Sequence, residues 1–228
     1  MKFTIITLFP EIFESVFSSS ILARAQKKDL IQINFVNLRE FGIGPHRIVD
    51  DKPYGGGTGM VLRFDVLDAA LTSVRQGKNE KVILLEPIGE KYEQKKAEKY
   101  SKLDHLIIIS GHYEGFDARF REEVDEIVSI GDFILSGGEI AAMTIVESTA
   151  RLVKNVVPKS AATEIESFSQ IDGERILEYP QYTRPEEYKG RKVPQVLISG
   201  DHKKIKEYRK REAIKLTKKL RPDLVKND

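Results

Sequence analysis

Three glycine-bearing segments carry the residues best suited to hold a small molecule. They are residues 86–89 (EPIG), 111–117 (GHYEGFD) and 129–139 (SIGDFILSGGE). Glycine has no side chain, so the backbone amides and carbonyls of such segments can approach a ligand closely. Each segment alone is also typical of an ordinary turn between a strand and a helix. Because three such segments occur in one domain, a small-molecule site explains them as well as three ordinary turns do.

Two further segments have the composition of nucleic-acid contacts. Residues 53–60 (PYGGGTGM) follow residues 46–51 (HRIVDD) and form either a flexible connector or a loop that presents His46 and Arg47 to a phosphate or a base. Residues 179–185 (YPQYTRP) alternate aromatics, prolines and an arginine. They either clamp a linker onto a domain or stack on an unpaired base while Arg184 meets a phosphate.

The charge distribution allows a polyanionic partner although the net charge of +2 argues against one. Residues 184–228 hold 15 Lys or Arg against 7 Asp or Glu, a balance of +8, which leaves −6 for residues 1–183. An acidic body with a basic C-terminal part is typical of proteins that meet a polyanion. A solvated helix with its lysines outward is the alternative.

Several classes of chemistry are excluded by what the chain lacks. There is no cysteine, so disulfides, zinc–thiolate sites, iron–sulfur clusters and cysteine nucleophiles are ruled out. The chain has no GxGxxG, GxxxxGK[ST] or GxSxG motif and only four histidines. No apolar run approaches the roughly 20 residues that span a bilayer, and acids stand where a signal peptide needs its cleavage site. We therefore expect no membrane association, and a cytoplasmic setting fits.

The elements that must position these segments alternate along the first 150 residues. Apolar runs predict strands at residues 2–8, 31–38, 82–85 and 106–109, and helical spacing follows at residues 65–74, 92–100, 117–124 and 139–153. This order predicts an α/β fold with a mainly parallel sheet. The glycine segments then follow the carboxyl ends of strands, where α/β proteins bind ligands.

The pattern changes after residue 153. Residues 155–175 lack sustained periodicity and are predicted to be a linker or an ordered loop, and the prolines of residues 178–195 exclude a long helix. Residues 201–220 predict a helix with an apolar stripe of Ile205, Tyr208, Leu216 and Leu220. We expect three parts: an α/β domain over residues 1–158, a linker over 159–177 and a small basic helical domain over 178–228.

Taken together, five segments resemble a known family. HRIVDDKPYGGGTGM, GHYEGFDAR, SIGDFILSGGE with AAMTIVE, LEYPQYTRP and VPQVLISGDHKKI occur in the order found in the bacterial tRNA (guanine-N1)-methyltransferases, the TrmD family. The resemblance implies a SPOUT fold with a C-terminal trefoil knot, S-adenosylmethionine as methyl donor, tRNA as substrate and a homodimer. It further implies methyl transfer to N1 of guanosine 37, beside the anticodon.

The resemblance also assigns the donor site, residue by residue, to the three glycine segments. The matching positions are Pro87 and Gly89 in the first; Gly111, Tyr113, Glu114 and Gly115 in the second; and Ile130, Gly131, Asp132, Phe133, Ile134, Leu135, Gly137 and Gly138 in the third.

For catalysis, the resemblance implies a general base at Glu166 and an assisting Arg151. The family has aspartate where this chain has Glu166, and residues 170–175 form an insertion relative to the family pattern. Asp172 and Glu164 therefore remain rival bases. The family is associated with Mg²⁺, but no cluster of Asp, Glu and His in the sequence indicates a dedicated metal site.

The remaining implied contacts are with tRNA, and two other interpretations of the chain stay open. The tRNA candidates are His46, Arg47, Tyr54, Gly55, Gly56, Gly57, Tyr182, Arg184 and Lys203, with the other basic residues of the last helix. One alternative is a catalytically inactive RNA-binding or ribosome-assembly protein on the same scaffold. The other is a SPOUT enzyme for ribosomal RNA, which residues 46–57 and 177–185 do not favour.

Overall fold

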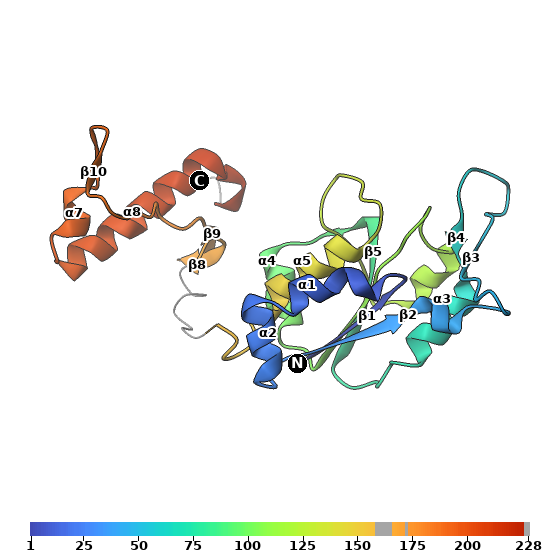
Figure 1. Ribbon diagram of the computed structural model, residues 1–228. Helices are drawn as coiled ribbons and strands as arrows, with labels where there is room; N and C mark the ends of the chain where they lie inside the picture. Colours follow the sequence, from blue (N-terminus) through green and yellow to red (C-terminus); the bar gives the residue numbers. More distant parts are fainter. Residues whose placement is uncertain (158–165, 172, 226–228) are drawn as a thin grey trace. The chain divides into compact units, whose positions relative to one another are not determined.

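The computed structural model describes residues 1–157, 166–171 and 173–225. The chain divides into two compact units, Met1–Pro158 and Lys159–Asp228 (Figure 1).

The first unit is built on a five-stranded sheet in which every neighbouring pair is parallel. The strand order is β2-β1-β6-β5-β7, which confirms the predicted α/β architecture with a mainly parallel sheet. Four of these strands overlap the predicted ones, and β7 is a fifth that sequence patterning missed. The strands are β1 (Lys2–Thr7), β2 (Gln32–Asn37), β5 (Glu80–Lys91), β6 (His105–Ile109) and β7 (Glu126–Ser129).

Helices cover both faces of this sheet because its central strands are apolar on both sides. In β6, Leu106 and Ile108 pack into one buried cluster, whereas Ile107 and Ile109 pack into the other. The first cluster is closed by η1 (Pro10–Phe13), α1 (Glu14–Phe17), α2 (Ser20–Lys27), α4 (Gln94–Tyr100) and α5 (Glu139–Ala150). The second is closed by η2 (Leu38–Phe41), α3 (Phe64–Thr72) and η3 (Ala118–Glu123).

The helices differ from their predicted bounds mainly at their ends. Residues 117–124, predicted as an α-helix, form the 3₁₀ helix η3, which buries only Phe120 and is capped by the Asp117 carboxylate accepting from the Arg119 amide. The helix predicted over 139–153 ends as α5 at Ala150. A short antiparallel pair, β3 (Asp50–Asp51) with β4 (Val61–Leu62), brackets the glycine-rich residues 53–60.

Strand β5 is interrupted where the first glycine segment lies. Residues 83–85 pair with residues 126–128 of β7, and the pairing then resumes at Glu90 with Val128, so the register shifts between Leu85 and Glu90. The predicted strand 82–85 is thus only the first part of a 12-residue strand. Residues 86–89 lie between the two paired stretches and do not pair with β7. They lie at the same edge of the sheet as the other two glycine segments.

The second unit contains two hairpins and a long helix (Figure 1). Part of the predicted linker is an antiparallel pair, β8 (Ser169–Ile171) with β9 (Glu174–Ile176), and β10 (Glu187–Tyr188) pairs with β11 (Arg191–Lys192). Then follow α7 (Gln195–Ile198), α8 (His202–Leu220) and η4 (Pro222–Leu224). Helix α8 confirms the predicted helix over 201–220, with Asp201 as its N-cap.

Helix α8 packs along a different stripe from the predicted one near its end. Its buried residues are Ala213 and Thr217, and the Thr217 hydroxyl accepts a hydrogen bond from the Leu177 amide at 2.9 Å. Leu220, expected in the apolar stripe, is exposed because it is the last helical residue. None of the helices in the described ranges combines the length and the apolar character needed to cross a membrane.

Candidate functional site

A pocket of about 290 Å³ lies at the carboxyl ends of β6 and β7 and at the break in β5, where the three glycine segments meet. This is the sheet edge at which α/β proteins place their ligands. The segments 86–89, 111–117 and 129–139 are therefore neighbours in space, as the sequence predicted. Of the expected donor-site residues, those that line the pocket are Pro87, Gly111, Tyr113, Glu114, Gly115, Ile130, Gly131, Phe133, Ile134, Leu135, Gly137 and Gly138.

Two glycines let the second and third segments touch through their backbones. The Gly138 amide donates to the Gly111 carbonyl at 2.8 Å, and His112 and Gly137 form an isolated antiparallel bridge. A Cβ on Gly138 would lie 2.9 Å from Ser110 Oγ and 3.0 Å from the Gly111 nitrogen. Contacts this short would force the segments apart, so the pocket wall depends on glycine at this crossing.

A buried polar cluster lies behind this wall. Glu139, in the first turn of α5, is only 4% exposed. Its Oε1 accepts from the Thr7 hydroxyl at 3.1 Å, and its Oε2 lies 3.8 Å from His112 Nδ1. Within the described residues, His112 Nδ1 and Ser110 Oγ are buried without a hydrogen-bond partner. The ends of β1 and β6 and the start of α5 therefore meet around one carboxylate.

An ion pair joins the first segment to η3. The Arg121 guanidinium donates two hydrogen bonds to the Glu86 carboxylate, from Nε at 2.9 Å and from Nη2 at 3.1 Å. This contact raises the pKa of Arg121 above its usual value. Glu86 lines the pocket and is mostly buried, so Arg121 offsets its charge.

Two residues expected at the donor site lie outside the lining. Gly89 instead faces β7, where an added Cβ would lie 2.5 Å from the Val128 nitrogen. Its role in the fold is a close approach between two backbones. The Asp132 side chain is 94% exposed, and its carboxylate lies 4.0 Å from Lys91 Nζ.

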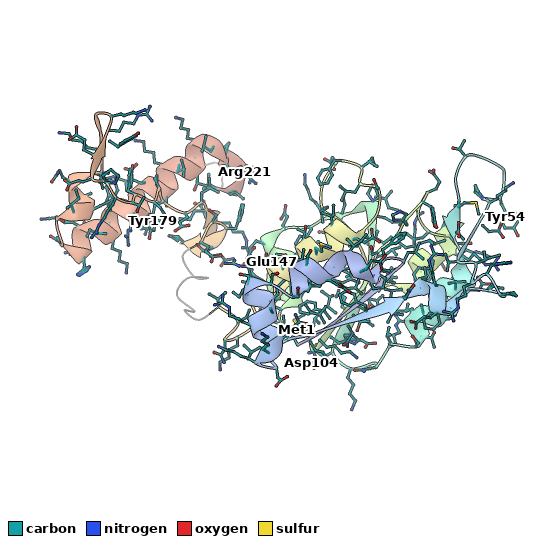
Figure 2. All side chains as sticks on the ribbon, viewed as in Figure 1. Met1, Tyr54, Asp104, Glu147, Tyr179 and Arg221 are labelled. Carbon is teal, nitrogen blue, oxygen red and sulfur yellow. The ribbon has the colours of Figure 1, made fainter. Side chains whose placement is uncertain are left out.

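The glycine-rich loop 53–60 lies beside the pocket. The Glu114 amide donates to the Met60 carbonyl at 3.0 Å, and a Cβ on Gly59 would collide with the Glu114 side chain. Tyr54 projects from this loop and is fully exposed (Figure 2). Gly55, Gly56 and Gly57 all have positive φ, and His46 and Arg47 are exposed on the preceding segment.

A second hollow of about 710 Å³ lies under this loop. Its lining includes Tyr54, Phe64 and Arg119, and it shares Phe116 with the first pocket. The Arg119 guanidinium lies 5.5 Å from the centre of the Phe64 ring. An exposed aromatic side chain and a cation therefore stand at the edge of the candidate ligand pocket.

The second unit presents a basic and aromatic surface. Arg184 is exposed, and the Tyr182 side chain is 48% exposed. The Arg209 guanidinium lies 4.7 Å from the centre of the Tyr179 ring, and that of Arg211 lies 5.3 Å from the Tyr208 ring. The exposed basic residues of α8 include Lys203, Lys204, Lys206, Arg209, Lys210 and Arg211.

The two expected catalytic residues belong to different units. Arg151 is the half-buried C-cap of α5, and Glu166 is half-buried in the second unit. Both have electrostatic or hydrogen-bond partners. The rival bases Asp172 and Glu164 lie outside the described residues. No group of three metal-ligating side chains occurs in the ranges 1–157, 166–171 and 173–225.

Sequence reasoning missed three side chains that shape the pocket. Glu86, Arg121 and Glu139 lie within or beside the named motifs but were given no role. The sequence does contain a signal for Glu139. An acid that directly follows two glycines at the start of a predicted helix lies in the first turn, where a carboxylate is favourable. The Glu86–Arg121 pair had none, since its partners are 35 residues apart.

Fold and site define a class: an α/β protein with a pocket at the carboxyl edge of a parallel sheet and a separate basic unit. The model of one family, described as tRNA (Guanine-1)-methyltransferase TrmD, matches residues 1–227. The chain belongs to this family, which confirms the resemblance seen in its motifs.

Individual relatives agree over nearly the full length. The chain is 51% identical to the tRNA (guanine-N(1)-)-methyltransferase of Bacillus pumilus, over 99% of this chain and 92% of the relative. It is 50% identical to the protein of that name from Bacillus subtilis, over 100% and 93%. A protein of that name from Thermus thermophilus is 46% identical, over 99% and 92%.

Proposed function

We propose that this protein transfers a methyl group from S-adenosylmethionine to N1 of guanosine 37 in tRNA. The observation that carries the proposal is the pocket built from the three glycine segments, in a chain that belongs to the TrmD family. The alternative of an inactive RNA-binding scaffold is not favoured, because curated relatives across the whole chain are named as methyltransferases.

The pocket fits the donor in size and in the character of its wall. Ligand pockets commonly enclose about 300–1,000 Å³ behind apolar walls with a few polar groups. Gly111, Gly137 and Gly138 line the pocket without side chains, so an adenosine or a methionine group can approach the backbone closely, while Leu85, Ile130 and Leu135 supply apolar contacts. When bound, S-adenosylmethionine supplies an electrophilic methyl group.

The acceptor chemistry requires a base and a cation. Guanine N1 carries a proton at neutral pH, so its attack on a methyl carbon needs a general base at that N–H. We assign this role to Glu166, which removes the N1 proton. Negative charge develops on O6 as the proton leaves, and we assign its stabilisation to the Arg151 guanidinium. This charge is lost when N1 bonds to the methyl carbon and the methyl–sulfur bond breaks.

We propose that the target base is turned out of the anticodon loop and held by aromatic side chains. Unstacking a loop base costs only a few kcal/mol, and stacking on an aromatic ring returns about 1–3 kcal/mol. Tyr54 and Tyr182 are the exposed candidates, with Gly55, Gly56 and Gly57 allowing the loop to move close. His46, Arg47 and Arg184 are the candidates for nearby phosphates.

Helix α8 is proposed to hold the tRNA backbone. Changing Lys203, Lys204 and Lys206 to Ala should weaken tRNA binding and lower its salt slope by roughly 0.7–0.9 for each phosphate that is no longer neutralised. Changing Lys27 and Lys28, which are exposed in the first unit, is the matched control. An unchanged affinity and slope in the α8 variant would contradict this assignment.

We further propose a homodimer and the family's trefoil knot. Ile12 and Val16, on η1 and α1, are 45% and 38% exposed, and Ile140 on the adjacent α5 is 58% exposed. Apolar side chains on one helical face are typical of a protein interface. The proposal of a knot rests on the family, whose model matches residues 1–227. We also propose a cytoplasmic setting, because the proposed substrate is tRNA.

The decisive experiment measures transfer of labelled methyl from S-adenosylmethionine to tRNA transcripts with G or A at position 37. We expect labelling of the G37 transcript only. Glu166→Gln should lower the rate by roughly 10²–10⁴-fold, whereas Glu186→Gln, an exposed acid of the same unit, should not. Equal labelling of both transcripts would refute the target, and donor binding without transfer would favour the inactive scaffold.

A further inference from the structure

Four acidic side chains lie in or beside the first pocket: Glu86, Glu114, Asp132 and Glu139. The Glu86 charge is offset by the two hydrogen bonds from Arg121. The Asp132 side chain is 94% exposed, so water and salt screen it. Glu139 is 4% exposed and lies one layer behind the wall formed by Gly137, Gly138 and Ala141.

Glu139 has little to neutralise it within the described residues. One carboxylate oxygen accepts a hydrogen bond from the neutral Thr7 hydroxyl. Among the described residues, the only basic nitrogen within 4.0 Å of the carboxylate is His112 Nδ1, at 3.8 Å. Oε2 occupies the space that a side chain at position 137 would need. Only a glycine backbone therefore separates this carboxylate from the pocket.

The position of Glu139 also reverses the field of its helix. The first turn of a helix carries about half a positive charge from its aligned peptide dipoles. Helix α5 begins at the pocket wall, so this end alone would disfavour a cation in the pocket. A carboxylate in that turn gives the region a net negative potential.

We propose that Glu139 makes the pocket select a cationic methyl donor over the neutral product. This inference rests on the proposed use of S-adenosylmethionine. The donor and S-adenosylhomocysteine differ by one methyl group and by the positive charge on sulfur, and their other groups are the same. A buried negative charge acts through a medium of lower dielectric than water, so it favours the sulfonium and leaves the thioether unaffected. The product therefore leaves more readily than the donor.

The remaining charged groups at the pocket do not provide this selection. Glu114 is exposed, and Asp132 is exposed beside Lys91, so both act through solvent. Tyr113 and His112 flank the wall, and His112 would add positive rather than negative charge if protonated. The buried negative potential comes from Glu139.

The test compares three ligands on the full-length protein by calorimetric titration. The ligands are S-adenosylmethionine, S-adenosylhomocysteine and sinefungin, in which an amine that is protonated at neutral pH replaces the sulfonium. In Glu139→Gln we expect binding of both cationic ligands to weaken by about tenfold or more and binding of S-adenosylhomocysteine to change by less than about threefold. The amide keeps an acceptor for the Thr7 hydroxyl, so the wall should persist.

Two controls separate charge from shape. Glu147→Gln removes the same charge from the exposed side of α5, about 12 Å along the helix, and should leave all three affinities unchanged (Figure 2). Glu139→Asp keeps the charge, so the preference for cationic ligands should remain even if all three bind less well. Equal weakening of the three ligands in Glu139→Gln would show that Glu139 only shapes the wall, and would overturn the inference.

A measurement on the unaltered protein keeps the inference testable if Glu139→Gln does not fold. The preference for S-adenosylmethionine over its product should change little between about 0.05 M and 0.5 M salt, because a buried charge is screened weakly. If the preference disappeared at high salt, it would come from the exposed acidic side chains and not from Glu139. If the protein bound none of the three ligands, the proposed function would be wrong. If it bound all three without a preference for the cationic ligands, only the role of Glu139 would be wrong.

Discussion

Replacing Gly89 by alanine adds one methyl group where β5 and β7 come closest. The new Cβ would lie 2.5 Å from the Val128 nitrogen and 2.6 Å from the Ile127 carbonyl carbon. These neighbours are backbone atoms of a paired strand and cannot rotate away. We therefore expect the two strands to separate locally, which weakens the second stretch of pairing between Glu90 and Val128.

The size of the effect follows from two opposing terms. Forcing an extra methyl group into a packed region costs about 1–3 kcal/mol. Alanine also restricts the unfolded chain more than glycine, which returns about 0.4–1 kcal/mol. The net loss is about 1–2 kcal/mol, and for a protein of this size each kcal/mol lowers Tm by about 2–4 °C. Donor affinity should fall as well, because Val128 lines the pocket.

Thermal and urea unfolding of the protein measure this loss of stability, and titration with S-adenosylmethionine measures the affinity. Ile88→Ala is the control, because Ile88 is 65% exposed, lies next to Gly89 and does not line the pocket. Its cost should stay within about 0.5 kcal/mol. A Gly89→Ala protein with the Tm of the unaltered chain would refute the close approach between β5 and β7.

Three other substitutions test the packing and electrostatics of the two units. Lys96→Met should destabilise the first unit by about 3 kcal/mol in urea unfolding, because Lys96 is buried between Glu90 and Glu126. Its loss leaves Glu126, within the described residues, with only Lys81 at 3.5 Å and the Tyr100 hydroxyl at 2.9 Å as side-chain partners; the exposed Lys95→Met should cost almost nothing. Burial, and then the charge of Lys2, hold the pKa of His105 below its ordinary 6.5. The unfolded chain therefore binds the proton more readily, so the free energy of unfolding should fall as pH drops below about 6.5; urea titrations across that range should show this slope and should lose it in His105→Asn. Thr217→Val should cost about 1–3 kcal/mol in the second unit, because the Leu177 amide loses its acceptor; an unchanged urea midpoint would mean that water replaces the hydroxyl.

The central strands and the pocket could be predicted because the signal for each is local. Residues 82–85 and 106–109 are continuous apolar runs, and such runs form strands that are buried on both faces. The first two glycine segments follow these runs directly, so placing the strands also placed these two segments at one edge of the sheet. The third segment follows β7, which the sequence did not predict.

Strand β7 and the β8–β9 hairpin could not be found in this way. Residues 126–129 (EIVS) are too short and too mixed to show a period, and they become a strand because β5 supplies the pairing. Residues 169–176 were interpreted as linker because no side-chain pattern marks them, although Ser169 pairs with Ile176 in the structure. The pairing of β7 with a strand distant in sequence carries no local signal, and strands of three residues such as β8 and β9 are too short to show an alternating pattern.

The same limit applies to the chemistry of the site, and one glycine from the first segment and one from the third show why. In sequence, Gly89 and Gly137 belong to two of the glycine segments, and both are predicted donor contacts. In the structure, a Cβ added to Gly89 would meet the backbone of β7, whereas Gly137 has a carboxylate and an imidazole on its side-chain side. The residue type therefore predicts that another group comes close to the backbone, but only the packing shows which group it is. At Gly89 the close approach joins two strands, and at Gly137 it places a buried carboxylate behind the pocket wall.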